Sequence, residues 1–324
     1  MATSNSLART QQKVGIATYL SQNAVRNQIN SVVGNSGQRF VSSIVSAVQA
    51  NPALQECSNT SIVSAALLGE SLNLSPSPQL GQYYMVPYKN NKTGSVEAQF
   101  QLGYKGYIQL AIRSGQYKKL NVLAIKEGEL VRFDPLDEEI EVHLIEDEEV
   151  REETPTIGYY AMFEYTNGFR KAMYWSKRKM LTHADKYSKA FSIDASTVKT
   201  RFGAKTKVSF ADFEAGNYPK EDEWMYSSFW YKDFDGMAYK TMLRQLISKW
   251  GIMSIEMQSA IDKDMAVIRE DGTADYVDNS PEDVYVDSSI VEPVADQADA
   301  SEPEATPAQQ NEAPTTKVEE DFFA

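Results

Sequence analysis

Residues 101–120, QLGYKGYIQLAIRSGQYKKL, most constrain what this chain can fold into. Apolar residues recur there at i, i+3 and i+4, which predicts a buried helix face made of Ile108, Ala111 and Ile112. Polar residues recur every four positions and predict the opposite, exposed edge, made of Lys105, Gln109 and Arg113. Gly115 follows where a left-handed helix end is expected. The stretch therefore predicts a short amphipathic helix with a basic edge.

Two glycines, Gly103 and Gly106, bracket Tyr104 and Lys105 just before this helix. Glycine lets another chain or a ligand approach closely. A relaxed backbone beside Tyr and Lys suits a phosphate chain with stacked bases. An ordinary strand-to-helix corner with a solvated basic face explains the same residues. On these residues alone both interpretations stay open.

Charge is segregated along the chain. The formal net charge of the 324 residues is −13, but residues 270–324 hold sixteen acidic side chains against the single Lys317. The rest of the chain is therefore close to neutral. Within it, residues 127–153 are strongly acidic, whereas residues 165–250 hold sixteen basic and nine acidic side chains. A nearly neutral body with basic blocks is compatible with an anionic ligand.

Cysteine usage and hydropathy indicate a protein of the cytoplasm. The single cysteine, Cys57, excludes an internal disulfide framework and fits a reducing compartment. No apolar run is long enough to cross a membrane, and the N-terminus lacks the apolar core of a signal peptide. We expect no contact with a membrane.

Periodicity predicts an α+β fold in which a β-hairpin and antiparallel sheet pack with helices. Helices are predicted at residues 39–49 and 61–72, in the short stretch between Gly103 and Gly115, and at 176–189, 235–250 and 253–268, with Asp235 as the cap of the fifth. Strands are predicted at residues 83–88, 96–102, 121–125, 156–165 and 170–175, and exposed strands in the acidic block. Residues 190–223 are predicted to be a loop. Three parts follow: residues 1–35 as a flexible or oligomerisation arm, 36–269 as the core, and 270–324 as a disordered acidic tail.

No motif for catalysis or metal binding stands out. Residues 103–106 lack the spacing of a phosphate-binding Walker loop, and no G-x-G-x-x-G fingerprint follows a strand. His143 and His183 have no metal-ligand spacing with Cys57. Glu127, Glu129 and Asp134 can be imagined as a nuclease cluster, but the surrounding acidic block favours solvated carboxylates. We therefore expect no enzyme and no cofactor.

Two blocks of the sequence carry a recognisable pattern: LGYKGYIQLA at residues 102–111, followed by RSGQ at 113–116, and MAYKTMLRQL at 237–246. Both blocks resemble those of the RecT-type single-strand DNA annealing proteins of phages and prophages. Residues 83–87 fit the strand that precedes the first block. Together the blocks span most of residues 40–265, and their order is more specific than either block alone. The N-terminal arm and the acidic tail carry no matching motif.

The resemblance implies an α+β fold similar to the core of ring-forming annealing proteins. It implies binding of single-stranded DNA and annealing of complementary strands without ATP, by an oligomeric ring or filament. The implied partners are single-stranded DNA, the annealed duplex intermediate, further copies of the chain, a phage exonuclease and a host single-strand binding protein, in the bacterial cytoplasm. The alternatives are a DNA-coating protein without annealing activity, an assembly protein with incidental DNA binding, and a metal-dependent nuclease.

The predicted DNA-binding residues are Tyr104, Lys105, Tyr107, Arg113, Lys118, Lys119, Arg201, Lys205, Lys207, Lys240 and Arg244. Their cations would neutralise phosphates along a groove. Tyr104 and Tyr107 would pack against sugars, separate bases or lie in the core. We expect Lys105→Ala and Arg244→Ala to weaken binding with little change in melting temperature. The acidic tail would fold back on the basic groove, dock on a partner, or only solubilise the chain.

Overall fold

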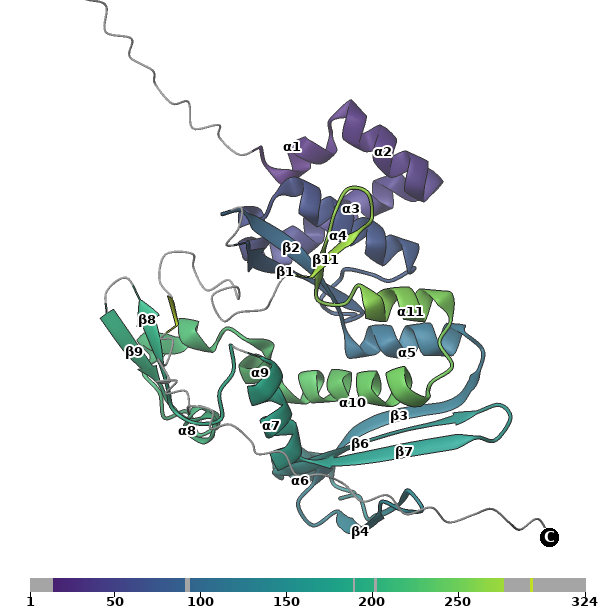
Figure 1. Ribbon diagram of the computed structural model, residues 1–324, viewed down its shortest axis with the longest axis vertical. Helices are drawn as coiled ribbons and strands as arrows, with labels where there is room; N and C mark the ends of the chain where they lie inside the picture. The colour runs from purple at the N-terminus through teal and green to yellow at the C-terminus, as the bar shows by residue number, and fades with distance from the viewer. Residues whose placement is uncertain (1–13, 91–93, 189, 201–202, 277–291, 294–324) are drawn as a thin grey trace, which may run out of the picture. The chain divides into compact units, whose positions relative to one another are not determined.

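The computed structural model describes residues 14–90, 94–188, 190–200, 203–276 and 292–293. These residues form helices and antiparallel sheets, so the predicted α+β class is confirmed (Figure 1). They belong to a first compact unit, residues 1–293, whereas the second unit, residues 294–324, contains no described residue. The predicted acidic tail therefore falls almost entirely outside the described residues.

Four helices and a four-stranded sheet share the first hydrophobic core. The helices are α1 (Ile16–Leu20), α2 (Asn23–Val33), α3 (Gly37–Ala50) and α4 (Asn59–Ser71), with the short helices η1 (Gly34–Ser36) and η2 (Pro52–Glu56). The sheet has the order β1-β2-β10-β11, from strands β1 (Tyr83–Lys89), β2 (Val96–Leu102), β10 (Ala266–Ile268) and β11 (Ala274–Tyr276). Leu20, Val25 and Ile29 are buried here, so the described part of the predicted arm packs against the protein. Its role in self-association stays a prediction.

A small residue, Gly69, lets α4 lie close to the first strand. A Cβ added at Gly69 would lie 2.3 Å from the ring of Tyr83, so this glycine leaves the space that the ring fills. Tyr83 in turn stacks on Phe100 of β2, with ring centroids 5.0 Å apart. The β1–β2 hairpin is thereby fixed between the N-terminal helices and the helix that follows it.

Three helices lie above the second sheet (Figure 1). Helix α5 (Tyr104–Arg113) contacts both α10 (Phe234–Trp250) and α11 (Ile255–Asp262), and α10 contacts all three strands of the sheet. The sheet has the order β3-β6-β7, from β3 (Tyr117–Lys126), β6 (Thr156–Tyr165) and β7 (Arg170–Ser176). Leu243 and Ile247 of α10 belong to the first core, whereas Met242 and Leu246 belong to the second. Helix α10 therefore joins the two cores.

Asp233, rather than the predicted Asp235, caps α10. Its side chain accepts the Gly236 N–H at 2.9 Å. Asp235 lies in the first turn and accepts the Tyr159 hydroxyl at 2.6 Å, which ties the start of α10 to β6.

An aromatic-rich segment covers the second core, and the prediction of a loop for its residues 190–223 was wrong. It contains β8 (Ser196–Thr200), β9 (Gly203–Lys207), α8 (Phe210–Glu214), η3 (Lys220–Tyr226) and α9 (Phe229–Lys232). The predicted helix after β7 is α7 (Lys177–Tyr187), and the Ser176 side chain caps it by accepting the Lys179 N–H. Backbone pairing places β12 (Glu292–Pro293) beside β8. Strands β8 and β9 were missed because polar residues dominate them, and the single Val198 that packs on the second core makes no alternating apolar pattern.

The acidic block packs on the other face of the β3-β6-β7 sheet. It forms a hairpin of β4 (Leu130–Asp134) and β5 (Glu139–Val142), as predicted, followed by an unpredicted helix, α6 (Glu148–Glu153). Glu129 is fully buried and accepts Arg151 Nε at 2.6 Å and the Lys126 N–H at 2.7 Å. Burial would raise the pKa of the Glu129 carboxyl, but these hydrogen bonds outweigh it and lower the pKa. The expectation of a solvated carboxylate was therefore wrong for Glu129, which is a structural anchor.

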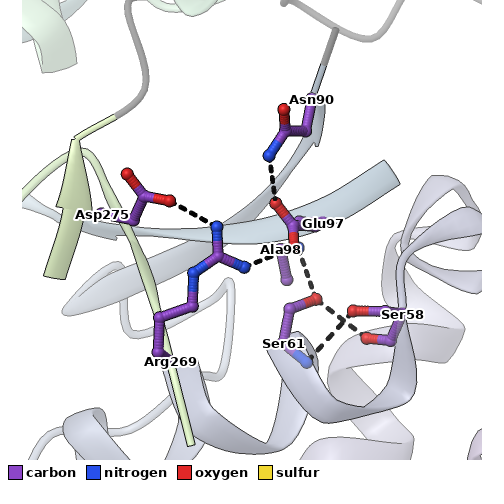
Figure 2. A network of polar contacts seen from close by, with 7 residues as sticks. All are labelled: Ser58, Ser61, Asn90, Glu97, Ala98, Arg269 and Asp275. Carbon is purple, nitrogen blue, oxygen red and sulfur yellow. Dashed lines mark hydrogen bonds and ion pairs between the residues drawn. The ribbon is translucent and has the colours of Figure 1, made fainter. Parts of the chain in front are cut away.

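A polar network fixes the last strand of the first sheet (Figure 2). Arg269 Nη1 donates to Glu97 Oε1 at 2.6 Å, and its other terminal nitrogen donates to Asp275 of β11. Asn90 donates to the second oxygen of Glu97 at 3.1 Å. Ser61 of α4 accepts the neighbouring Ala98 N–H at 2.7 Å. Strand β11 is thus held through Arg269, although it lies beyond the boundary predicted at residue 269.

Candidate nucleic-acid interface

The two glycines before α5 make a close contact with the protein's own backbone. A Cβ at Gly103 would lie 2.1 Å from the Gly81 carbonyl oxygen, and one at Gly106 would lie 2.2 Å from that of Gln82. Gly103 also donates its N–H to the Gln82 carbonyl at 2.8 Å. A strand-to-helix corner therefore accounts for both glycines, because no larger residue fits against residues 81 and 82.

Helix α5 shows the exposed edge that its sequence predicts. Lys105, Gln109 and Arg113 are exposed, and Gly115 adopts the predicted left-handed conformation with φ of +69°. The buried face is made of Tyr107, Leu110 and Ala111. The prediction that Ile112 faces the core was wrong, since its side chain is 59% exposed. Because α10 and α11 contact α5, the buried face consists of Tyr107, Leu110 and Ala111, each one position before a residue of the predicted face.

Two cations of this edge form no ion pair among the described residues. No described carboxylate lies within ion-pair distance of Lys105, whose ammonium is 5.9 Å from the centre of the Tyr104 ring. Arg113 donates to the carbonyl oxygens of Gln109 and Asn73, each at 3.2 Å, and likewise forms no ion pair there. Lys105 therefore faces solvent without a described ionic partner, whereas Arg113 forms no ion pair but lies close enough to Glu256 to interact with its carboxylate.

The first residues of β3 add two further cations. Lys118 and Lys119 share the carboxylate of Glu164 on β6, at 2.5 and 3.8 Å. Lys118 beside this group lowers the pKa of the Glu164 carboxyl. Both lysine side chains remain more than half exposed. One carboxylate thus balances two ammonium groups, which leaves a net positive charge at this end of the edge.

The second block of sequence contributes an ionic cluster around a buried carboxylate, in which Lys240 is buried and Arg244 is partly exposed. Asp264, between α11 and β10, is fully buried and accepts Lys240 Nζ at 3.0 Å and Arg244 Nη1 at 2.6 Å. It also accepts the Leu102 N–H at 2.9 Å, at the end of β2. Asp264 therefore connects the two sequence blocks. No local pattern around it in the sequence indicates this role.

The tyrosines of the first block differ in exposure. Tyr107 is fully buried, and burial followed by the nearby Asp264 raises the pKa of its hydroxyl well above the ordinary value. Tyr104 is partly buried and meets Tyr239 edge to face, with ring centroids 5.5 Å apart. The sequence left open whether these tyrosines contact DNA or pack in the core. Tyr107 packs in the core, whereas Tyr104 remains partly accessible.

The remaining predicted cations lie at β9, or outside the described residues. Arg201 is not described. Lys205 pairs with Asp222, and its ammonium lies 5.9 Å from the centre of the Trp224 ring. Lys207 is buried and donates to the Ala190 carbonyl at 3.0 Å, and burial lowers its pKa to about 8. Lys207 therefore lies inside the aromatic segment and stabilises it through this hydrogen bond.

The described ranges hold no group of three or more His, Cys, Asp or Glu side chains arranged to bind a metal ion. Within the same ranges, no helix has the length and apolar character needed to span a membrane.

The fold and this site define an α+β protein in which one buried carboxylate joins the strand before a basic helix edge to a second motif helix. The chain belongs to the RecT family, whose model matches residues 38–281. It is 27% identical to Protein RecT of Escherichia coli (strain K12) over 270 residues, 82% of this chain and 84% of that protein. It is also 38% identical to the uncharacterized protein YqaK of Bacillus subtilis (strain 168) over 268 residues, 83% and 76% of the two chains. The resemblance is thereby confirmed, and the family is one of recombination and strand-annealing proteins.

Proposed function

We propose that this protein binds single-stranded DNA and anneals complementary strands without ATP, as an oligomeric ring or filament. The observation that carries the proposal is the exposed basic edge of α5 and β3 in a member of the RecT family. The edge consists of Lys105, Arg113, Lys118 and Lys119, with Gln109 between the first two. We refer to these five residues as the α5 edge.

The α5 edge suits a DNA backbone better than a base. Its cations offer charge without a shaped pocket, and releasing condensed counterions from phosphates supplies affinity that does not depend on sequence. A strand held by its phosphates keeps its Watson–Crick edges free. A second strand can then test for complementarity, so the strands themselves supply the specificity. Tyr104 stands beside Lys105 at the start of the edge and would pack against a sugar or a base.

We propose a supporting role for three cations of the predicted set, of which Lys207 and Lys240 are buried and Arg244 is partly exposed. Lys240 and Arg244 neutralise Asp264, and Lys207 lies against the rings of Tyr226 and Tyr231, so these groups hold in place the elements that carry the surface. Lys205 is partly exposed despite its pair with Asp222 and stays in the proposed surface, together with Arg201. The remaining proposed partners are further copies of the chain, a phage exonuclease and a host single-strand binding protein, in the bacterial cytoplasm.

A binding titration with variants tests the α5 edge. Lys105→Gln should weaken binding to single-stranded DNA and reduce the slope of log affinity against log salt by about 0.7, the share of one phosphate contact. Arg26→Gln is the matched control, because Arg26 is an exposed cation of α2 outside the edge. Equal affinities and slopes for the wild type and Lys105→Gln would remove Lys105 from the proposed surface.

The second candidate is a protein that coats single strands without pairing them. A coating protein would use the same basic edge, so the binding titration would give the same result for both candidates. Strand pairing separates the two, since a coating protein slows or leaves unchanged the pairing of complementary strands, whereas an annealing protein accelerates it.

A further inference from the structure

A row of aromatic and cationic side chains runs from the end of β7 along α7. Its members are four residues apart, followed by one neighbouring lysine: Trp175, Lys179, His183, Tyr187 and Lys186. Spacing of four places side chains on one face of a helix. We call these five residues the α7 row. It is separate from the α5 edge in sequence, and α7 packs on β6 and β7.

The rings of the α7 row contact one another in sequence order. His183 meets Trp175 with ring centroids 5.4 Å apart and Tyr187 with centroids 4.6 Å apart. Trp175 is half-buried against the second core, whereas Tyr187 is 63% exposed. The row therefore begins at the core and ends in an open aromatic surface.

Each end of the row carries a cation. Lys179 Nζ lies 4.4 Å from the centre of the Trp175 ring, and Lys186 Nζ lies 5.3 Å from that of Tyr187. Neither lysine forms an ion pair with a described residue, in contrast to Lys177, which pairs with Glu214 at 2.9 Å. The row thus presents aromatic faces flanked by two ammonium groups that form no ion pair with any carboxylate in the described ranges.

Local stability explains this arrangement poorly. Contacts between residues four apart stabilise a helix by only about 0.2–0.5 kcal/mol each. Lys179 also lies in the first turn of α7, where the helix dipole disfavours a cation. Exposed rings interleaved with unneutralised cations instead match how proteins hold single-stranded nucleic acid, by stacking on bases and attracting phosphates.

We propose that the α7 row is a second contact for single-stranded DNA, at which an unpaired base stacks on Tyr187 while Lys179 and Lys186 hold the flanking phosphates. This inference rests on the proposed function, because it takes single-stranded DNA as the ligand. The α5 edge then grips the backbone alone, whereas the α7 row contacts bases. Binding at the α7 row should therefore require a base on the DNA strand, whereas binding at the α5 edge should require only the phosphates.

A pair of probes isolates that dependence. The first is a labelled oligothymidylate, and the second is an abasic oligomer of the same length, which keeps the phosphates and lacks the bases. The full chain is titrated with each probe as the wild type and as Tyr187→Ala, Tyr187→Phe and Lys105→Gln. Phe169→Ala is the matched control, because Phe169 is an exposed aromatic of the β6–β7 turn outside the row.

Tyr187→Ala should bind the oligothymidylate about tenfold more weakly and the abasic oligomer as tightly as the wild type does. Tyr187→Phe should restore binding, since it keeps the ring, and Phe169→Ala should match the wild type. Lys105→Gln should lose affinity for both probes alike. Unchanged binding by Tyr187→Ala, an equal loss on both probes, or a changed oligomeric state of this variant would each overturn the proposal. A wild type that binds neither probe would overturn the proposed function as well.

Discussion

Arg244 Nη1 donates to Asp264 Oδ2 at 2.6 Å, and this contact ties the second motif helix to the start of the first. The same carboxylate accepts Lys240 and the Leu102 N–H, directly before Gly103. A buried carboxylate with two cations and a backbone donor has its charge and its lone pairs satisfied. The position of α5, and with it the α5 edge, therefore depends on a residue that lies outside both sequence blocks.

Asp264→Asn should lower the free energy of unfolding by about 3 kcal/mol, because it leaves Lys240 buried without a counter-charge. Denaturant unfolding measures the change. Asp262→Asn, an exposed position of α11, is the matched control and should stay within about 0.5 kcal/mol of the wild type. Similar stabilities of the two variants would contradict a structural role for Asp264. By the same reasoning we now expect Arg244→Ala to lower the melting temperature, unlike the expectation from sequence alone.

Gly106→Ala should destabilise the protein strongly, because its Cβ would overlap the Gln82 carbonyl oxygen. Backbone cannot move aside as a flexible side chain does, so we expect a loss of about 2–3 kcal/mol, which thermal unfolding would detect. Gly15→Ala is the control, since nothing lies within 4 Å of its added Cβ. If Gly106→Ala folded as stably as the control and lost only DNA affinity, the glycine would instead serve close approach of a ligand.

Lys207 should make stability rise with pH in the alkaline range. Burial lowers its pKa to about 8, below the roughly 10.4 of lysine in an unfolded chain. Between these values the unfolded chain keeps the proton and the folded protein releases it, so the Lys207 contribution to the free energy of unfolding increases with pH. The slope is at most about 1.4 kcal/mol per pH unit.

A comparison with Lys207→Met isolates this contribution. The difference in unfolding free energy between wild type and variant should shift in favour of the wild type from about pH 8 to about pH 10. Lys205→Met is the control, because Lys205 is partly exposed on the same strand. A constant difference over this window would show that the Lys207 pKa is not lowered.

Removal of residues 277–324 should tighten DNA binding severalfold at low salt if the acidic tail competes for the basic surface. The deletion removes thirteen acidic residues and Lys317, and the gain should fade at high salt because screening weakens the competition. Affinities equal to those of the full chain at low salt would leave the tail a partner-docking or solubilising role. The deletion also removes the two residues of β12.

The site of truncation matters for this experiment. A chain that ends after Tyr276 keeps β11 and the contact between Arg269 and Asp275. A chain that ends after Arg269 loses both and should melt at a lower temperature than the longer truncation. Equal melting temperatures would show that β11 adds nothing measurable to the fold.

Local patterns predicted the elements well where one face of a helix or strand is buried. The α5 helix, its exposed Lys105 and Arg113, and the turn at Gly115 follow from spacing and backbone preference alone. Ile112 was misplaced because neighbouring helices decide which apolar residues of α5 are covered. Hydrophobic periodicity shows that a helix has an apolar face, but it does not show which neighbouring element will cover that face.

Burial of charge could not be predicted from spacing. Lys240 and Arg244 are four residues apart, as are Lys105 and Gln109, yet the first pair turns inward to Asp264 and the second faces solvent. The difference comes from a residue far along the chain that has no local signature. The α7 row was not predicted from the sequence either, although its residues recur every four positions from Trp175 to Tyr187.

The measurement that tests the central claim most directly mixes two complementary labelled oligonucleotides with the protein in the absence of ATP and follows energy transfer between the labels. We predict that the wild type accelerates pairing over the protein-free control, that Arg26→Gln matches it, and that Lys105→Gln is slower. Non-complementary strands should give no transfer. Pairing no faster than without protein, despite tight binding of single strands, would contradict annealing and leave a coating protein.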